Sequence, residues 1–161
     1  MPSEHLHNQL SSLIQQLSKP YGTPEFEPHV TLIGGLTGDL ESIILKSAKL
    51  SSMIRFYALT LDKIDYRDEF YRCLYVQIKP TDEVIQANAQ ARNVFDNTTK
   101  EPYMPHLSLM YGSIDKRIKQ RIIQTVGTSL HGSFPAESIH LFSTTGSPFE
   151  WFRIAQFVLK E

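Results

Sequence analysis

The sequence predicts an α+β protein with two lobes, built from a duplicated unit. One observation is the order of helix and strand patterns along the chain, which runs αβαββ and then αβαββ again. Another is a short histidine-containing segment that recurs at the equivalent place of the second half. The length of 161 residues fits one such domain and leaves little room for a further module. We therefore expect a single bilobal domain over 1–161, with halves of about 1–79 and 80–161.

The first half combines helical and strand periodicity. Its predicted elements are a helix at 4–18, a strand at 28–33, a helix at 39–50, and strands at 54–65 and 71–79. Leucines at helical spacing mark the first helix, which begins behind a Ser3 cap and ends before Pro20 and Gly22. The last two strands are predicted to form a hairpin around the polar turn at 67–69.

The second half repeats that order. Its predicted elements are a helix from the Thr81 cap to about 96, a strand at 106–111, a helix at 115–127, and strands at 137–143 and 150–159. The segment Thr145-Gly146-Ser147-Pro148 is a strong turn signal between the last two strands. Both halves therefore end in a predicted hairpin, which supports the duplication.

Composition excludes several classes of protein. Hydrophobic residues make up 41% of the chain, enough for a folded core, so wholesale disorder is excluded. The balance of 16 basic and 17 acidic side chains argues against an extended surface for long nucleic acid. A single cysteine, Cys73, cannot form an intrachain disulfide and suits a reducing compartment. The sequence has neither a signal peptide pattern nor an apolar run of membrane-spanning length, so we expect a cytoplasmic protein.

The duplication is visible residue by residue around the two histidines. Aligning His29 with His106 pairs a proline, an apolar residue, a hydroxyl residue and a leucine in the same order. The aligned pairs are Phe26 with Tyr103, Pro28 with Pro105, Val30 with Leu107, Thr31 with Ser108, Leu32 with Leu109, and Gly35 with Gly112. Two such segments in matching halves indicate a shared function for them.

Strand geometry groups these residues by face. Side chains alternate along a strand, so the histidine and the hydroxyl residue two positions later point to the same side. The intervening apolar residues then face a core. If a pseudo-twofold axis relates the halves, both histidine and hydroxyl pairs face each other across a central cleft. The candidate site residues are His29, Thr31, His106 and Ser108.

Two imidazoles and two hydroxyls suit phosphoester chemistry. Histidine titrates near pH 6.5, so one ring can accept a proton while the other donates one. The hydroxyls of Thr31 and Ser108 can donate hydrogen bonds to phosphate oxygens. The segments contain no adjacent Asp, Glu or Cys, so the residues favour this chemistry over a metal site, although histidine is a common metal ligand.

These segments resemble the signature of the two-histidine (2H) phosphoesterases. The strings are Pro28-His29-Val30-Thr31-Leu32 and Pro105-His106-Leu107-Ser108-Leu109, and the wider sequence around them looks most like the plant and fungal cyclic phosphodiesterases. The resemblance implies two antiparallel sheets around a central cleft, with helices outside. It also implies hydrolysis of ADP-ribose 1″,2″-cyclic phosphate to ADP-ribose 1″-phosphate and of nucleoside 2′,3′-cyclic phosphates to 2′-phosphates, without metal or cofactor. The partner would be such a small molecule, and the protein a monomer.

The same resemblance assigns roles to individual residues. His29 and His106 correspond to the catalytic histidines, and Thr31 and Ser108 to the phosphate-binding hydroxyls. Tyr111 corresponds to a tyrosine that lines the site in the plant-type enzymes. Strict alternation would bury it, so it reaches the cleft only if its strand bends or ends just before Gly112. 

One departure from the pattern is at the N-terminus. Relatives have a strand ahead of the first helix, and here that strand is expected to be absent. Either the start is assigned too late, or the first lobe has an open sheet edge. An aromatic residue on this strand borders the base-binding part of the cleft in relatives, so its absence bears on substrate affinity more than on chemistry.

Residues outside the motifs have weaker signals. Tyr71 and Arg72, at the end of the first predicted hairpin, could supply a stacking ring or a phosphate contact. Trp151 is predicted to lie in the core or on the cleft wall, Cys73 in the core, and His140 on a strand surface. The basic residues of the fourth helix, Lys116, Arg117, Lys119 and Arg121, are expected to form a solvated face.

Two alternative functions fit the same pattern. One is the RNA-acting branch of the superfamily, which ligates or cuts 2′–5′ linkages, and the near-neutral charge argues against it. The other is a noncatalytic nucleotide-binding module, which the retention of both histidines and both hydroxyls disfavours.

Overall fold

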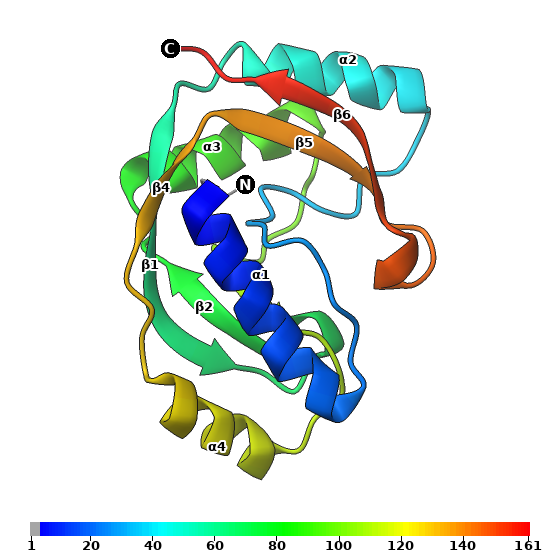
Figure 1. The fold of residues 1–161 in the computed structure, drawn as a ribbon. Coiled ribbons are helices and arrows are strands. Elements are labelled where there is room, and N and C mark those ends of the chain that lie inside the picture. The colour runs from blue at the N-terminus through cyan, green and yellow to red at the C-terminus, as the bar shows by residue number, and fades with distance from the viewer. Residues whose placement is uncertain (1–3) are drawn as a thin grey trace.

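A computed structural model describes residues 4–161, which form four α-helices and six strands (Figure 1). The helices are α1 (Glu4–Ser18), α2 (Leu40–Ser51), α3 (Asp82–Val94) and α4 (Lys116–Val126). The strands are β1 (Tyr57–Tyr66), β2 (Leu74–Ile78), β3 (His106–Met110), β4 (Ser133–Ala136), β5 (Ser138–Ser143) and β6 (Phe152–Val158). Short 3₁₀ turns lie at Lys19–Tyr21, Phe70–Arg72 and Pro148–Glu150. This is the α+β class that the sequence predicts.

The strands form two antiparallel sheets, as expected. One sheet has four strands in the order β3-β2-β1-β4, and the other pairs β5 with β6. Figure 1 shows α1 crossing in front of β1 and β2, and α2 beside β6. Helix α1 packs on β3, α3 packs on β1 and α2, and α2 packs against both β5 and β6. Among residues 4–161, no helix is both long enough and apolar enough to cross a membrane.

The core explains why β2 and β3 are fixed in register. Leu74, Val76 and Ile78 alternate along β2 and are buried, as are Leu107 and Leu109 on β3. Because successive side chains of a strand point to opposite faces, the other residues of both strands face away from these. A one-residue slip would exchange the two faces, so core burial also sets the register of the site residues.

Several sequence predictions hold at the level of single residues. The first helix has the predicted limits, and the Thr81 side chain caps α3 by accepting a hydrogen bond from the Val84 N–H. Cys73 lies in the core with no exposed surface. The predicted Ser3 cap lies outside the described residues, and so does the stretch ahead of α1 in which the strand of relatives is expected to be absent.

Three predictions are corrected. The segment 28–33 is not a regular strand, because only Val30 forms a bridge, with Leu107. Strand β4 was not predicted, since Gly132 and Pro135 look like loop residues; it lies at an edge, where proline is tolerated. Lys119 is not solvated but is only 1% exposed.

Candidate active site

The two histidine segments lie side by side in antiparallel orientation. Val30 and Leu107 form a backbone bridge that directly joins the two motifs. In an antiparallel pair, the residues on either side of a bridge also face each other across the chains and share the opposite face of the pleat. The facing pairs are therefore His29 with Ser108 and Thr31 with His106. The structure thus brings together all four predicted residues, with each histidine opposite the hydroxyl of the other motif.

Both imidazoles are held in the same way. The Nδ1 of His29 lies 2.6 Å from the carbonyl oxygen of Glu27, and the Nδ1 of His106 lies 2.9 Å from that of Met104. Each partner is two residues ahead of its histidine, so the duplication extends to the hydrogen bonds. A carbonyl only accepts, so Nδ1 carries the hydrogen in both rings. The nitrogen left for other chemistry is therefore Nε2 in both.

Side chains from the rest of the domain hold the first motif in place. The Tyr103 hydroxyl donates to the carbonyl of Thr31 at 2.8 Å, and the Asn88 amide donates to the carbonyl of Leu32 at 2.7 Å. Asn88 is buried on α3. These bonds and the single Val30 bridge replace the ladder that a regular strand would have. Sequence reasoning missed both anchors, although Tyr103 occupies the repeat position of Phe26.

The two hydroxyl residues differ in their surroundings. Thr31 is exposed, so its hydroxyl is open to a ligand. Ser108 is 6% exposed, and its hydroxyl donates to the carbonyl of Tyr71 at 3.1 Å. A phosphate bound at Ser108 would therefore take over a hydrogen bond that the Tyr71 carbonyl now accepts.

Burial makes both rings harder to protonate. Desolvation is the main cause that lowers the pKa of His29, and the Glu27 carbonyl partly offsets it. Desolvation likewise lowers the pKa of His106, and the nearby positive charges of Arg72 and Arg67 and the second imidazole lower it further. The His106 ring also makes an edge-to-face contact with Tyr75, with ring centroids 5.2 Å apart. The two imidazoles are thus close enough for their charges to interact.

Tyr111 reaches the site through an irregularity in β3. Ser108 pairs with Tyr75 and Met110 pairs with Leu74, so β3 carries one extra residue there, which is a β-bulge. The strand ends at Met110, and Gly112 turns the chain at a φ of +141°. Tyr111 is buried, as strict alternation predicts, yet its hydroxyl lies close enough to the Ser108 hydroxyl to influence the pKa of Tyr111. Burial is the main cause that raises the pKa of Tyr111 to about 12.

A group of aromatic rings surrounds Tyr111. Phe26 stacks on it with centroids 3.8 Å apart and an angle of 16° between the planes, and Phe26 also meets the edge of the His29 ring. The centroid of the Tyr71 ring lies 5.4 Å from that of Tyr111 and 5.8 Å from that of Trp151. Tyr71 is 51% exposed. The rings therefore form an aromatic wall that begins at the first histidine and extends to solvent.

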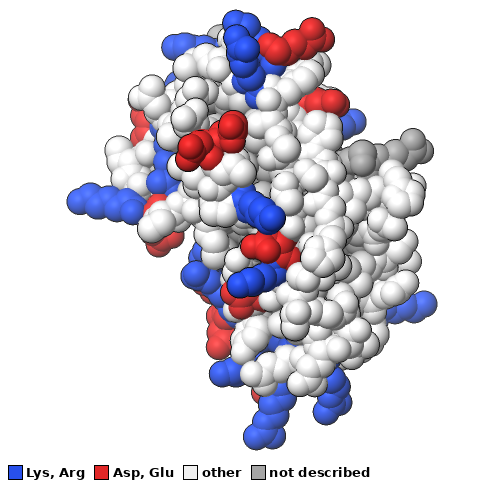
Figure 2. Space-filling view, turned by 90° about the vertical axis from the view of Figure 1, so that its left-hand side faces the viewer, with Lys and Arg blue, Asp and Glu red and all other residues white. Residues whose placement is uncertain are grey.

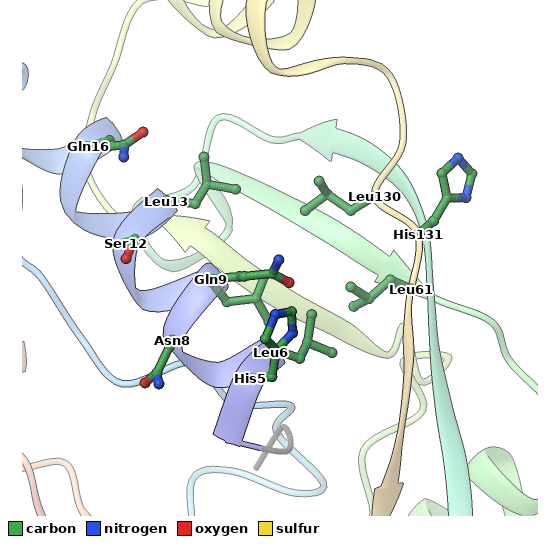
Figure 3. Close-up of a pocket in the computed structure, with 11 residues that line it drawn as sticks. His5, Leu6, Asn8, Gln9, Ser12, Leu13, Gln16, Leu61, Leu130 and His131 are labelled. Atoms are coloured by element: carbon green, nitrogen blue, oxygen red, sulfur yellow. The ribbon is translucent and has the colours of Figure 1, made fainter.

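A well-defined pocket lies away from these residues. It has a volume of about 610 Å³ and lies between most of the length of α1, from His5 to Gln16, and residues of β1 and the loop before β4 (Figure 3). None of the predicted site residues lines it. His5 and His131 border it, but within residues 4–161 no three His, Cys, Asp or Glu side chains are grouped as metal ligands.

Figure 2 shows basic and acidic side chains interspersed on one face of the molecule.

Comparison with known proteins identifies the family of this chain. A family model described as "Cyclic phosphodiesterase-like protein" matches residues 1–154. The chain belongs to the cyclic phosphodiesterase-like family. Within this family, the chain is 31% identical over 150 residues to the cyclic phosphodiesterase of Arabidopsis thaliana, with 89% of this chain and 82% of the relative covered. It is 24% identical over 165 residues to a 2′,3′-cyclic-nucleotide 3′-phosphodiesterase of Yarrowia lipolytica, covering 74% and 76% of the two chains.

A solved structure shares the fold of this cyclic phosphodiesterase-like protein. It is the Escherichia coli protein LigT complexed with 3′-AMP, which superposes with a TM-score of 0.64 at 16% identity and covers 95% of this chain and 92% of LigT. The expectations of a 2H phosphoesterase fold and of an enzyme of the cyclic phosphodiesterase type are confirmed.

Proposed function

We propose that this chain hydrolyses nucleotide cyclic phosphates, with His29 and His106 as its acid and base. The observation that carries the proposal is the Val30–Leu107 bridge, which sets each histidine opposite the hydroxyl of the other motif. Each half of the chain, about 1–79 and 80–161, contributes one histidine, so one copy contains the whole constellation. We propose that the enzyme acts as a cytoplasmic monomer.

The proposed reaction is an in-line attack of water on phosphorus. Neutral Nε2 of one histidine takes a proton from the water as its oxygen bonds to phosphorus. Protonated Nε2 of the other histidine gives its proton to the leaving ribose oxygen as the bond from phosphorus to that oxygen breaks. The product is a phosphate monoester, and the two rings have exchanged protonation states. Each proton transfer contributes roughly 10²–10⁴-fold to the rate.

The hydroxyls are proposed to hold the phosphate. Thr31 and Ser108 would donate to the non-bridging oxygens, where negative charge is concentrated in the transition state. This role is supported by the exposure of Thr31 and by the single carbonyl that Ser108 now contacts. Tyr111 is proposed as a substrate contact because its hydroxyl adjoins that of Ser108. No step requires a metal or an organic cofactor.

The proposed substrates are ADP-ribose 1″,2″-cyclic phosphate and nucleoside 2′,3′-cyclic phosphates, which would be opened to ADP-ribose 1″-phosphate and 2′-phosphates. The Arabidopsis and Yarrowia relatives, named for cyclic phosphodiester hydrolysis, support this class. The aromatic wall offers exposed ring surface for a base, since base stacking on aromatic side chains tolerates different bases.

Hydrolysis of 2′,3′-cyclic AMP and of ADP-ribose 1″,2″-cyclic phosphate in excess EDTA tests the proposal. The wild type, His29→Ala, His106→Ala and the control His131→Ala would be compared, because His131 is exposed and lies outside the motifs. We expect turnover by the wild type and the control, and a loss of at least about 10²-fold in each motif variant. Circular dichroism would confirm that each variant is folded.

The outcomes separate the alternatives. Activity that survives in either motif variant would overturn the acid-base assignment. Binding of 2′-AMP without any turnover by the wild type would favour the noncatalytic binding module. The relative kcat/KM values of the two substrates would rank them for this enzyme.

A further inference from the structure

Lys119 is an anomaly in an otherwise exposed basic segment. Lys116, Arg117 and Arg121 of α4 are exposed, as the sequence predicts, but Lys119 is only 1% exposed. Burying a lysine is costly unless its charge is paired and hydrogen-bonded. The environment of the buried ammonium group therefore indicates what this lysine holds.

Both partners of Lys119 belong to the segment that joins β1 to β2. Its Nζ donates to the Asp68 carboxylate at 2.6 Å and to the carbonyl of Arg67 at 2.9 Å. It also lies 5.3 Å from the centre of the Tyr66 ring. Lysine and carboxylate are 51 residues apart in the sequence, so the pair ties α4 to a distant loop. We call residues 67–72 the aromatic loop.

The other side of the aromatic loop borders the candidate active site. The carbonyl of Phe70 accepts from the Gly112 N–H at 2.9 Å, and the carbonyl of Tyr71 accepts from the Ser108 hydroxyl at 3.1 Å. The ring of Tyr71 packs against those of Tyr111 and Trp151, which also adjoin each other. Phe70 and Tyr71 are 43% and 51% exposed, so the loop presents two rings to solvent beside the phosphate-binding serine. One end of this loop is therefore clamped by Lys119, and the other forms part of the site.

We propose that Lys119 is a positioning residue for base recognition: it fixes the aromatic loop so that Tyr71 can stack on the base of the substrate. The proposal rests on the proposed function. Within residues 4–161, the hydrogen bonds of Lys119 go to Arg67 and Asp68 and to neither motif, so it acts through the loop that it holds. Its removal therefore affects substrates that carry a base and spares substrates that lack one.

The test compares Lys119→Met with the wild type on two substrates. One is 2′,3′-cyclic AMP, and the other is 1-O-methylribose 2,3-cyclic phosphate, which has the same cyclic phosphate and no base. Asp68 is exposed, with 82% of its side chain accessible, so the Met variant leaves no buried charge behind. Arg121→Met is the matched control, since Arg121 is an exposed basic residue of the same helix.

We expect the Met variant to raise KM for 2′,3′-cyclic AMP by about tenfold, within the range that base stacking contributes, with kcat changed less than about threefold. The base-free substrate should keep its kcat/KM within about twofold, and the Arg121 control should match the wild type. Equal losses on both substrates, or no loss on either, would overturn the proposal. A purely stabilising role would lower the amount of folded enzyme and leave KM unchanged.

A double-variant comparison adds a second test. Tyr71→Ala removes the ring itself, and its exposure makes a folded variant expected. If Lys119 acts through Tyr71, the double variant is no weaker on 2′,3′-cyclic AMP than Tyr71→Ala alone. Additive losses would show that Lys119 acts by another route, and would overturn the proposal. If Lys119→Met is poorly folded, Lys119→Gln replaces it in this comparison, because glutamine removes the ion pair with Asp68, leaves no buried charge and can still donate to the Arg67 carbonyl.

Trp151 fluorescence tests the role of Lys119 without requiring that the enzyme turn over a substrate. Trp151 is the single tryptophan of the chain and lies 5.8 Å from Tyr71, so its emission reports the position of the aromatic loop. Lys119→Met should increase acrylamide quenching of Trp151, and Arg121→Met should not. If the wild type hydrolyses neither substrate, the proposed function fails, and titration with 2′-AMP still measures the effect of Lys119 on binding. Unchanged quenching and unchanged affinity would overturn the positioning role.

Discussion

Val30 and Leu107 pair across the two halves of the chain, and this one bridge aligns both histidine motifs. Neither residue carries chemistry, but their pairing places the polar neighbours of both on a common face. Leu107 is fully buried, so its side chain faces the core and its polar neighbours face the opposite side of the strand. The candidate site is thus a consequence of apolar packing between two copies of one pattern.

Removing the Thr31 hydroxyl tests phosphate binding in isolation. Thr31 is exposed, and its side chain makes no hydrogen bond to another of the described residues, so Thr31→Val should leave stability unchanged. We expect kcat/KM for 2′,3′-cyclic AMP to fall by roughly 10²-fold, as on losing a donor to a developing negative charge. Thr31→Ser keeps the hydroxyl and should retain most activity. Full activity in the valine variant would exclude this residue from phosphate binding.

The pH profile follows from the lowered pKa values of the two histidines. Burial, as the main cause, and nearby Arg72, Arg67 and His29 lower the pKa of His106, and burial lowers that of His29. Catalysis needs one protonated and one neutral ring, which is lost when pH falls below both pKa values or rises above both. A bell-shaped kcat/KM profile with its maximum below pH 6.5 is therefore expected.

Arg72→Gln provides the matched measurement for this profile. Arg72 is the charge that contributes most to lowering the pKa of His106, after burial. Its removal should raise that pKa and move the profile toward higher pH. A wild-type profile that is flat between pH 5 and 9, or an unmoved maximum in the variant, would contradict the assignment of both limbs to the histidines.

The sequence predicted the motifs and most elements because their signals are local. Amphipathic spacing gave α1, and a threonine cap gave the start of α3. The hydroxyls and imidazoles came together as expected because the duplication places them at equivalent positions. The predictions that failed depended on contacts with residues distant in the sequence. No pattern in the sequence around Lys119 indicates that its ammonium group pairs with Asp68, which lies 51 positions earlier. 

The first histidine motif gives a second example of a prediction that failed because it depended on distant residues. Alternating apolar residues predicted a strand at 28–33, but backbone pairing there is confined to Val30. Side chains from the second half, Tyr103 and Asn88, supply the missing hydrogen bonds. Periodicity indicates which face a segment can bury, whereas the groups that satisfy its backbone come from tertiary structure.

The stack of Phe26 on Tyr111 predicts a stability difference between two variants. Tyr111→Leu removes a buried ring and its stacking partner contact, and should lower the free energy of unfolding by about 2 kcal/mol. Tyr111→Phe keeps the ring and loses only the contact between its hydroxyl and that of Ser108, so the cost should stay below about 1 kcal/mol. Urea unfolding of both variants measures this difference. Equal costs would mean that the stack contributes little.

Removing the Tyr103 hydroxyl should loosen the first motif without unfolding the protein. This hydroxyl donates to the carbonyl of Thr31, and the motif has few other backbone partners. The free energy of unfolding should fall by only about 1 kcal/mol in Tyr103→Phe, the net value of one hydrogen bond. Activity should fall further, by about tenfold or more in kcat/KM, because small displacements of a catalytic group are costly.

The control and the readout separate positioning from general stability. Tyr21→Phe alters an exposed tyrosine outside the site, so it should change neither unfolding nor kcat/KM. If Tyr103 positions the motif, the Phe variant loses activity at temperatures where circular dichroism shows it fully folded. A loss of activity that only parallels unfolding on heating would assign Tyr103 a structural role alone. Because the variant keeps both histidines and both hydroxyls, any loss while folded measures the placement of the first motif.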